Sequence, residues 1–177
     1  MKKPPLQIKD DFLTKDELDP ILTLAANVHW EFDGATTYGT TDTLEHCASD
    51  NDIWDFQFVK LILHNSMVKD EAWMHALYPI FNKLQCRSLM RIKLNLNPYQ
   101  PEIHEYPMHL DQGWCKNDDI KVAIFYLNTC DGYTKLDDGT KVTSVGNRIM
   151  VMSGDIMHCG TNPTDVKARY VLNINYF

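Results

Sequence analysis

Three residues in the second half of the chain, His109, Asp111 and His158, have the types and spacing of a metal-ligand set. His109-Leu110-Asp111 is an H-x-D pair. On an extended segment, residues two positions apart point to the same face, so this imidazole and carboxylate would lie side by side. His158 would add a second imidazole from a distant strand. Two imidazoles and one carboxylate cover one face of an octahedral ion and leave the opposite face open, as Fe(II) centres that activate dioxygen require.

The H-x-D pair is weak evidence by itself, because seven histidines and eighteen aspartates in 177 residues produce about 0.7 such pairs by chance. The alternative interpretation is a surface pair and a capped turn. Arg169 favours the metal site, since it follows His158 by eleven residues at the start of the last predicted strand. A guanidinium binds a carboxylate through two parallel hydrogen bonds, so Arg169 suits a carboxylate-bearing ligand near the metal.

Length, charge and cysteine content restrict the class of protein. We expect one domain over residues 1–177, long enough for a substantial core. The net charge of −7 argues against a nucleic-acid partner, which needs a basic face. The five cysteines are scattered and odd in number, which favours reduced thiols and a cytoplasmic location. No signal peptide and no run of about 18 apolar residues is present, so we expect no membrane partner.

The first half of the chain, residues 1–87, is predicted to be helical with loops. Thr14 and Glu17 form a capping box that opens a helix ending near Val28. Residues 31–50 have no period and carry two glycines, so we interpret them as a candidate cover over a site. Residues 53–85 are predicted to be mostly helical, with Pro79 as a kink or break.

At Ser88 the hydrophobic period changes from that of a helix to that of a strand. Between residues 90 and 97 apolar and polar side chains alternate strictly, which predicts a half-buried strand. Short strands and turn signals follow up to the C-terminus. Helices followed by many short strands predict a mainly β fold with flanking helices, whose core from 88 to 177 is a jelly roll or double-stranded β-helix.

The block from Leu94 to Phe177 resembles the catalytic core of the Fe(II)/2-oxoglutarate-dependent dioxygenases. The similarity is greatest to the prolyl 4-hydroxylase-like branch, including its small bacteriophage-encoded members. The matching segments are His109-Leu-Asp111, Ala123-Ile-Phe-Tyr-Leu-Asn128, Asp131-Gly-Tyr-Thr134, Gly146-Asn-Arg-Ile-Met150, His158, Arg169-Tyr170 and Tyr176-Phe177.

This resemblance implies roles for particular residues. His109, Asp111 and His158 match the iron ligands, which would also make them the catalytic centre. Arg169 matches the basic residue that holds the distal carboxylate of the co-substrate 2-oxoglutarate. Tyr126 matches a tyrosine whose hydroxyl often joins that carboxylate.

The sequence departs from the family pattern at two places. Asn97 stands where many relatives have a tyrosine ahead of a Pro or Gly turn, and Asp131 replaces the first of two glycines. Asn97 remains a candidate for binding the co-substrate. Tyr106 and Trp114 flank the proposed ligands and are candidates for the substrate pocket.

The resemblance implies an enzyme that couples decarboxylation of 2-oxoglutarate by dioxygen to hydroxylation of a C–H bond. We expect a peptide side chain such as proline as substrate. The alternatives are a free small molecule oxidised by the same mechanism, and a non-enzymatic cupin-like metal-binding module.

Overall fold

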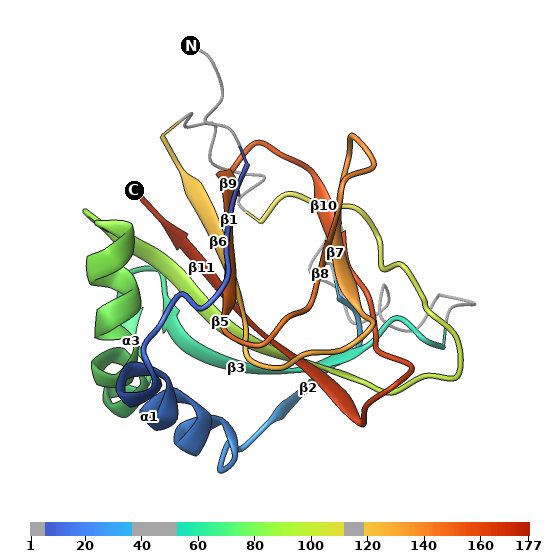
Figure 1. The fold of residues 1–177 in the computed structure, drawn as a ribbon, viewed down its shortest axis with the longest axis horizontal. Helices are drawn as coiled ribbons and strands as arrows, with labels where there is room; N and C mark the ends of the chain where they lie inside the picture. Colours follow the sequence, from blue (N-terminus) through green and yellow to red (C-terminus); the bar gives the residue numbers. More distant parts are fainter. Residues whose placement is uncertain (1–5, 37–52, 112–118) are drawn as a thin grey trace.

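Two antiparallel sheets face each other in the described part of the chain, which comprises residues 6–36, 53–111 and 119–177 of this computed structural model (Figure 1). The larger sheet has the order β1-β9-β6-β11-β5-β3-β2, with β4 paired to β3. Its strands are β1 (Gln7–Lys9), β2 (Glu31–Asp33), β3 (Gln57–His64), β4 (Met67–Val68), β5 (Leu89–Pro98), β6 (Lys121–Tyr126), β9 (Arg148–Ser153) and β11 (Ala168–Tyr176). The smaller sheet has the order β10-β7-β8, formed by β10 (His158–Gly160), β7 (Tyr133–Leu136) and β8 (Lys141–Thr143).

Two helices cover the outer face of the larger sheet (Figure 1). Helix α1 (Lys15–Ala25) begins with the predicted capping box, because Thr14 and Glu17 each bond the other's backbone N–H. Helix α3 (Glu71–Leu84) is capped by Asp70 and continues past Pro79. The predicted mainly β jelly-roll core with flanking helices is therefore confirmed.

The central strands carry apolar side chains on one face and a mixed set on the other, as the two-residue period of a strand requires. Towards the helices, Leu94 of β5, Phe125 of β6 and Leu172 of β11 pack in one core with Leu77 of α3. Between the sheets, a second core includes the following residues: Val122, Ile124, Tyr126, Leu136, Val142, Met150, Met152 and Val171. A cavity between the sheets, lined mostly by polar residues, contains the site described below.

The prediction that residues 53–85 are mostly helical is wrong for their first part. Residues 57–64 form β3, which is hydrogen-bonded to β5 and lies inside the larger sheet. Five of the eight residues of Gln57–His64 are apolar, and a short, mostly apolar run fits a buried strand as well as a buried helix. Glu31–Asp33 also forms a strand, β2, where no regular element was predicted. Residues 37–50 of the candidate cover lie outside the described residues.

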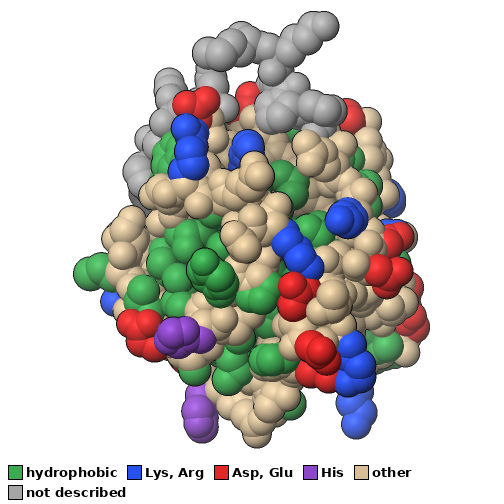
Figure 2. Space-filling view, turned by 60° about the vertical axis from the view of Figure 1, so that its left-hand side comes forward, with side chains coloured by type: hydrophobic (Ala, Val, Ile, Leu, Met, Phe, Trp, Pro, Cys, Tyr) green, Lys and Arg blue, Asp and Glu red, His purple; other side chains and the backbone are tan. Residues whose placement is uncertain are grey.

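The surface shown in Figure 2 mixes both signs of charge. Among the described residues on this face, acidic and basic side chains are interspersed, and apolar side chains gather beside them. Neither helix in the described ranges is long and apolar enough to cross a bilayer.

Candidate functional site

The backbone brings the two candidate histidines together from segments 49 residues apart. His109 and His158 form an antiparallel bridge in which each N–H donates to the other's carbonyl at 3.0 Å. Their ring centroids lie 4.8 Å apart. His158 begins β10, whereas His109 lies in the connection between β5 and β6 rather than in a regular strand. The expectation of an extended segment at His109 therefore holds only locally.

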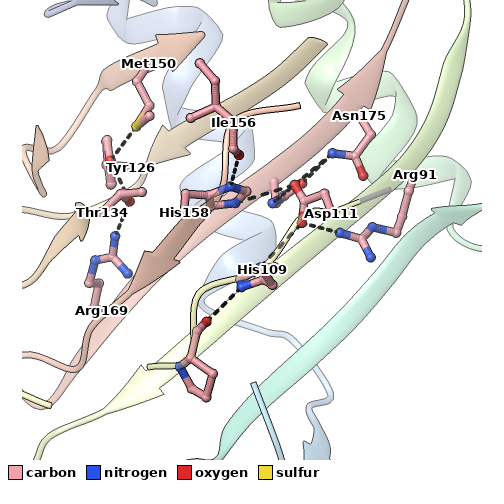
Figure 3. A network of polar contacts seen from close by, with 12 residues as sticks. Arg91, His109, Asp111, Tyr126, Thr134, Met150, Ile156, His158, Arg169 and Asn175 are labelled. Carbon is pink, nitrogen blue, oxygen red and sulfur yellow. Dashed lines mark hydrogen bonds and ion pairs between the residues drawn. The ribbon is translucent and has the colours of Figure 1, made fainter. Parts of the chain in front are cut away.

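Both imidazoles present the same nitrogen to Asp111. Nδ1 of His109 lies 3.1 Å from the carbonyl oxygen of Pro107, and Nδ1 of His158 lies 3.2 Å from that of Ile156. A carbonyl only accepts hydrogen bonds, so each Nδ1 carries a proton, and in the neutral ring Nε2 has the lone pair that a metal needs. The two Nε2 atoms each lie 3.8 Å from a carboxylate oxygen of Asp111 (Figure 3).

These ligand atoms fit a divalent ion. They lie within 4.8 Å of one another, and two neutral imidazoles with one carboxylate suit Fe(II) and its neighbours in the first transition series. Hydrogen bonds from the distal ring nitrogens to carbonyl groups are the usual outer support of metal-bound histidines. The lone pairs, the spacing and the supporting bonds therefore all agree with a metal centre.

The Asp111 carboxylate is buried and firmly held. It accepts a hydrogen bond from Arg91 Nη2 at 2.7 Å, and from the side-chain amides of Asn173 and Asn175 at 2.8 and 3.0 Å. Burial is the largest single influence and would raise the pKa of Asp111, but the positive charge of Arg91, the two nearby histidines and the hydrogen bond from Asn173 together outweigh it and keep the pKa below the ordinary value. Asp111 is therefore ionised and oriented before any ligand arrives.

His109 is also kept in its metal-binding form. Burial, followed by the proximity of His158, lowers the pKa of His109 to about 4. The imidazole is therefore neutral at physiological pH, and a proton competes weakly for its Nε2.

Arg169 lies at the other end of the same cavity, with only 2% of its surface exposed. Its guanidinium donates to Ser144 Oγ at 2.9 Å and to Thr134 Oγ1 at 3.1 Å, with longer bonds to Asn97 Oδ1 and the Thr161 carbonyl. Every one of these partners is neutral. Among the described residues no carboxylate pairs with this buried cation, so a ligand carboxylate would find an unneutralised charge there.

The remaining predicted co-substrate residues differ in how they reach the cavity. Asn97 lines it and is buried against Arg169. Tyr126 lies behind Thr134, to which its hydroxyl donates at 2.9 Å (Figure 3). Thr134 lines the cavity, accepts a hydrogen bond from Arg169 and shares a hydrogen bond with the Tyr126 hydroxyl, so it connects these two residues at the cavity wall. Of the two candidate aromatic walls, Tyr106 lines the cavity and Trp114 lies outside the described residues.

No protein-family model and no curated protein sequence matches the chain. Solved structures do match. A prolyl hydroxylase from Trichoplax adhaerens, in complex with a peptide fragment of the hypoxia inducible factor oxygen degradation domain, is 14% identical with a TM-score of 0.62, covering 97% of this chain and 83% of that one. A 2OG-Fe(II) oxygenase family protein from Burkholderia pseudomallei is also 14% identical with a TM-score of 0.62, over 97% and 84%. A prolyl-4-hydroxylase from Pseudomonas putida is 17% identical with a TM-score of 0.56, over 97% and 91%.

The chain has the fold of these oxygenases. At such low sequence identities the likeness establishes only the fold. The substrates and activities named for these solved structures are those of the proteins in question. Within this oxygenase fold the three candidate ligands and Arg169 line one cavity between the two sheets.

Several residues that support the site were not identified from the sequence. Arg91, Asn173 and Asn175 hold Asp111, and Thr134 connects Tyr126 to Arg169. A signal for the first three was present, because β5 and β11 each alternate polar and apolar residues. The alternation does not show which way the polar side chains of these strands point. In the structure they face the cavity and not bulk solvent.

Proposed function

We propose that this protein is an Fe(II)/2-oxoglutarate-dependent oxygenase that hydroxylates a C–H bond. The observation that carries the proposal is the joint placement of the ligand set and Arg169. Two imidazole Nε2 atoms and a carboxylate converge in a cavity whose other end holds a buried guanidinium with only neutral partners. A structural metal would not need the Arg169 guanidinium. A dicarboxylate that chelates the metal needs the metal at one end and a cation at the other.

In this proposal His109, Asp111 and His158 hold Fe(II), and the single carboxylate leaves the centre with a net positive charge of about one. When bound, the iron and 2-oxoglutarate supply the redox chemistry with dioxygen, which the protein itself cannot supply. The chain contributes orientation. Arg91 fixes Asp111, and the sheets exclude bulk water from the cavity floor.

Arg169 would bind the distal carboxylate of 2-oxoglutarate. Thr134 and Asn97, which line the cavity next to Arg169, would lie beside that carboxylate. Tyr126 would act through Thr134, since its hydroxyl is already bonded there. In this proposal Tyr126 positions Thr134.

For the substrate we propose a peptide side chain, with proline as the first candidate. The neighbouring solved structures include prolyl hydroxylases, one of them with a bound peptide. Tyr106 supplies an aromatic surface to the cavity, and proline rings pack well on such surfaces. A free small molecule oxidised by the same mechanism is the alternative.

Anaerobic addition of Fe(II) and 2-oxoglutarate tests the oxygenase function. We expect a weak visible charge-transfer band and, after admission of dioxygen, succinate formation. An Arg169→Met variant should lose the band at 2-oxoglutarate concentrations that saturate the wild type. The matched control is Arg148→Met, because Arg148 is an arginine bound to Asp10 away from the cavity. Absence of both band and succinate in the wild type would contradict the proposal and favour a cupin-like binding module.

A second measurement tests the substrate class. Proline-containing peptides should stimulate succinate formation above the level seen with 2-oxoglutarate alone, in comparison with free amino acids and nucleosides. Stimulation by a free metabolite only would exclude the peptide and leave the oxygenase chemistry standing.

A further inference from the structure

Lys93 is a third cation near the cavity, and the metal and co-substrate assignments do not use it. Arg91, Lys93 and Asn97 alternate along β5 and share its inner face, and Lys93 lines the cavity. Alternate residues of a strand are roughly 7 Å apart. Lys93 therefore lies between the end of β5 that holds Asp111 and the end that contacts Arg169.

The other two cations are already accounted for. Arg91 is paired with Asp111 at 2.7 Å, and Arg169 is assigned to the co-substrate. Among the described residues no carboxylate lies within ion-pair distance of the Lys93 ammonium, and the charges of Asp33 and Asp111 reach it only from further away. Binding of a divalent metal ion together with the dianion of 2-oxoglutarate would add no net charge to the cavity. The positive charge of Lys93 would therefore remain unneutralised.

The surroundings of Lys93 favour an anionic partner. Burial lowers the pKa of Lys93, and the nearby charge of Arg91 lowers it further, so its charged form is poorly stabilised by the protein alone. The next inward residue on β5, Asn95, also lines the cavity, and its Oδ1 is buried without a hydrogen-bond partner among the described residues. A ligand that brings a carboxylate to Lys93 and an N–H group to Asn95 would satisfy both.

Lys93 and Arg169 are placed to bind different anions. In the register of β5 and β11, Lys93 is opposite Asn173 and Arg169 is opposite Asn97. Their Cα atoms are thus four residues apart along the strands, roughly 13 Å. On its other side Lys93 is opposite Leu61 of β3, whereas Gln57, which also lines the cavity, is four residues further along β3, towards the Asn97 end.

We propose that Lys93 and Asn95 form a subsite for a carboxylate of the substrate. This inference rests on the oxygenase function proposed above and makes its substrate class narrower. The carboxylate has two possible sources. It is either the α-carboxylate of a free amino acid or an acidic side chain next to the hydroxylated residue of a peptide.

The test is a binding measurement with matched acids and amides. Protein loaded with Zn(II) and saturating 2-oxoglutarate is titrated, by ligand-observed NMR, with L-proline against L-prolinamide. The second pair is a capped Gly-Pro-Glu-Gly peptide against its Gly-Pro-Gln-Gly counterpart. A hydrogen-bonded charge pair should make the acid of at least one pair bind about tenfold more tightly. Preference in the first pair identifies a free amino acid, and preference in the second identifies an acidic peptide.

Variants identify the residue responsible. Lys93→Met should abolish the preference for the acid, and Lys93→Arg should keep most of it. Lys60→Met is the matched control, because the Lys60 ammonium pairs with Asp70 and does not line the cavity. Equal binding of acid and amide in both pairs, no binding of either acid, or a preference that survives Lys93→Met would overturn the subsite. A Lys93→Met variant that changes only the affinity for 2-oxoglutarate would assign Lys93 to the co-substrate instead.

The two proposals fail in different ways. Zn(II) supports no redox turnover, so acid and amide binding can be measured whether or not the iron form oxidises anything. Absence of both the charge-transfer band and succinate formation refutes the oxygenase function. Equal binding of acid and amide refutes only the Lys93 subsite.

Discussion

Single residues of the site are pre-oriented by bonds that the fold provides before any ligand binds. Asp111 is held on both carboxylate oxygens, and each histidine is held by a carbonyl two residues before it. Arg169 differs, because its partners hold the guanidinium in place but do not neutralise its charge. Its contribution should therefore be to ligand affinity, and not to metal affinity.

Replacement of Arg169 by methionine should raise the KM for 2-oxoglutarate by about a hundredfold or more. Removing one partner of a buried, hydrogen-bonded charge pair costs roughly 3–5 kcal/mol, which corresponds to at least that factor. Steady-state succinate formation at varied 2-oxoglutarate measures the change, and Mn(II) titration should show nearly unchanged metal affinity. An unaltered KM would assign the distal carboxylate to another cation, such as Lys93.

At the scale of elements, the turn before β7 explains one departure from the family pattern. Gly132 has no space for a side chain, because an added Cβ would lie 2.8 Å from Arg169 Cδ and 3.0 Å from the Asn162 carbonyl oxygen. Position 131 has no such restriction. There the Asp131 carboxylate accepts a hydrogen bond from the Thr164 backbone N–H at 2.8 Å and joins two loops.

Gly132→Ala should therefore impair 2-oxoglutarate binding without touching the metal ligands. The new methyl group would push Arg169 away from its position, since the backbone carbonyl on its other side cannot yield. We expect a KM for 2-oxoglutarate raised about tenfold or more, on the scale of 1.4 kcal/mol per factor of ten. Gly146→Ala is the matched control, because its Cβ would meet ordinary contacts of 3.6 Å. Equal kinetics in the two variants would contradict this account.

The connection that carries the H-x-D pair is tied to the smaller sheet through Glu105. Its carboxylate accepts a hydrogen bond from the Tyr133 hydroxyl at 2.6 Å and pairs with Lys135 and Lys141. The bonds from Lys135 and Tyr133 lower the pKa of Glu105 from 4.5 to about 2. A carboxyl with a lowered pKa stabilises the fold above its unfolded pKa and loses that contribution as the pH falls through the folded pKa.

Glu105→Gln should lower the melting temperature at neutral pH by a small amount, equivalent to less than about 1 kcal/mol because the cluster is near the surface. The difference from the wild type should shrink as the pH falls below 4.5 and become negligible below about 2. Thermal denaturation across this pH range, at low and high salt, measures it. A difference independent of pH would show that lost packing, not charge, is responsible.

At the scale of the whole molecule, the residues of the candidate metal centre are attached to both sheets. His158 belongs to the smaller sheet, whereas Asp111 is bonded to Asn173 and Asn175 of the larger one. A bound ion would link the two sheets across the cavity. Metal binding should therefore stabilise the fold as a whole.

Mn(II), Co(II) or Zn(II) should raise the melting temperature reversibly. At a free metal concentration of 100 times Kd the gain is about 2.7 kcal/mol, and a chelator should remove it. His158→Ala should lose most of the shift. The exposed His75 on α3 provides the control variant, His75→Ala. A full shift in the His158 variant would place the ion elsewhere.

The sequence alone determined the local patterns. The strict alternation of residues 90–97 identified a strand, and the capping box at Thr14 located the start of α1, because each depends only on neighbours along the chain. The order and spacing of His109, Asp111, His158 and Arg169 were also sufficient to select them together. The structure brings all four to one cavity.

Only the tertiary structure decided which strands are neighbours and what their polar faces meet. The apolar run in β3 suits a helix or a strand, and its place between β2 and β5 selects the strand. Asp111 meets Arg91, Asn173 and Asn175 because β5 and β11 pair in one particular register, with Arg91 opposite Asn175. A shift by one residue would turn these side chains to the helix face. Register is set by burial over the whole sheet, so no local pattern could reveal how Asp111 is held, or that Lys93 faces the same cavity.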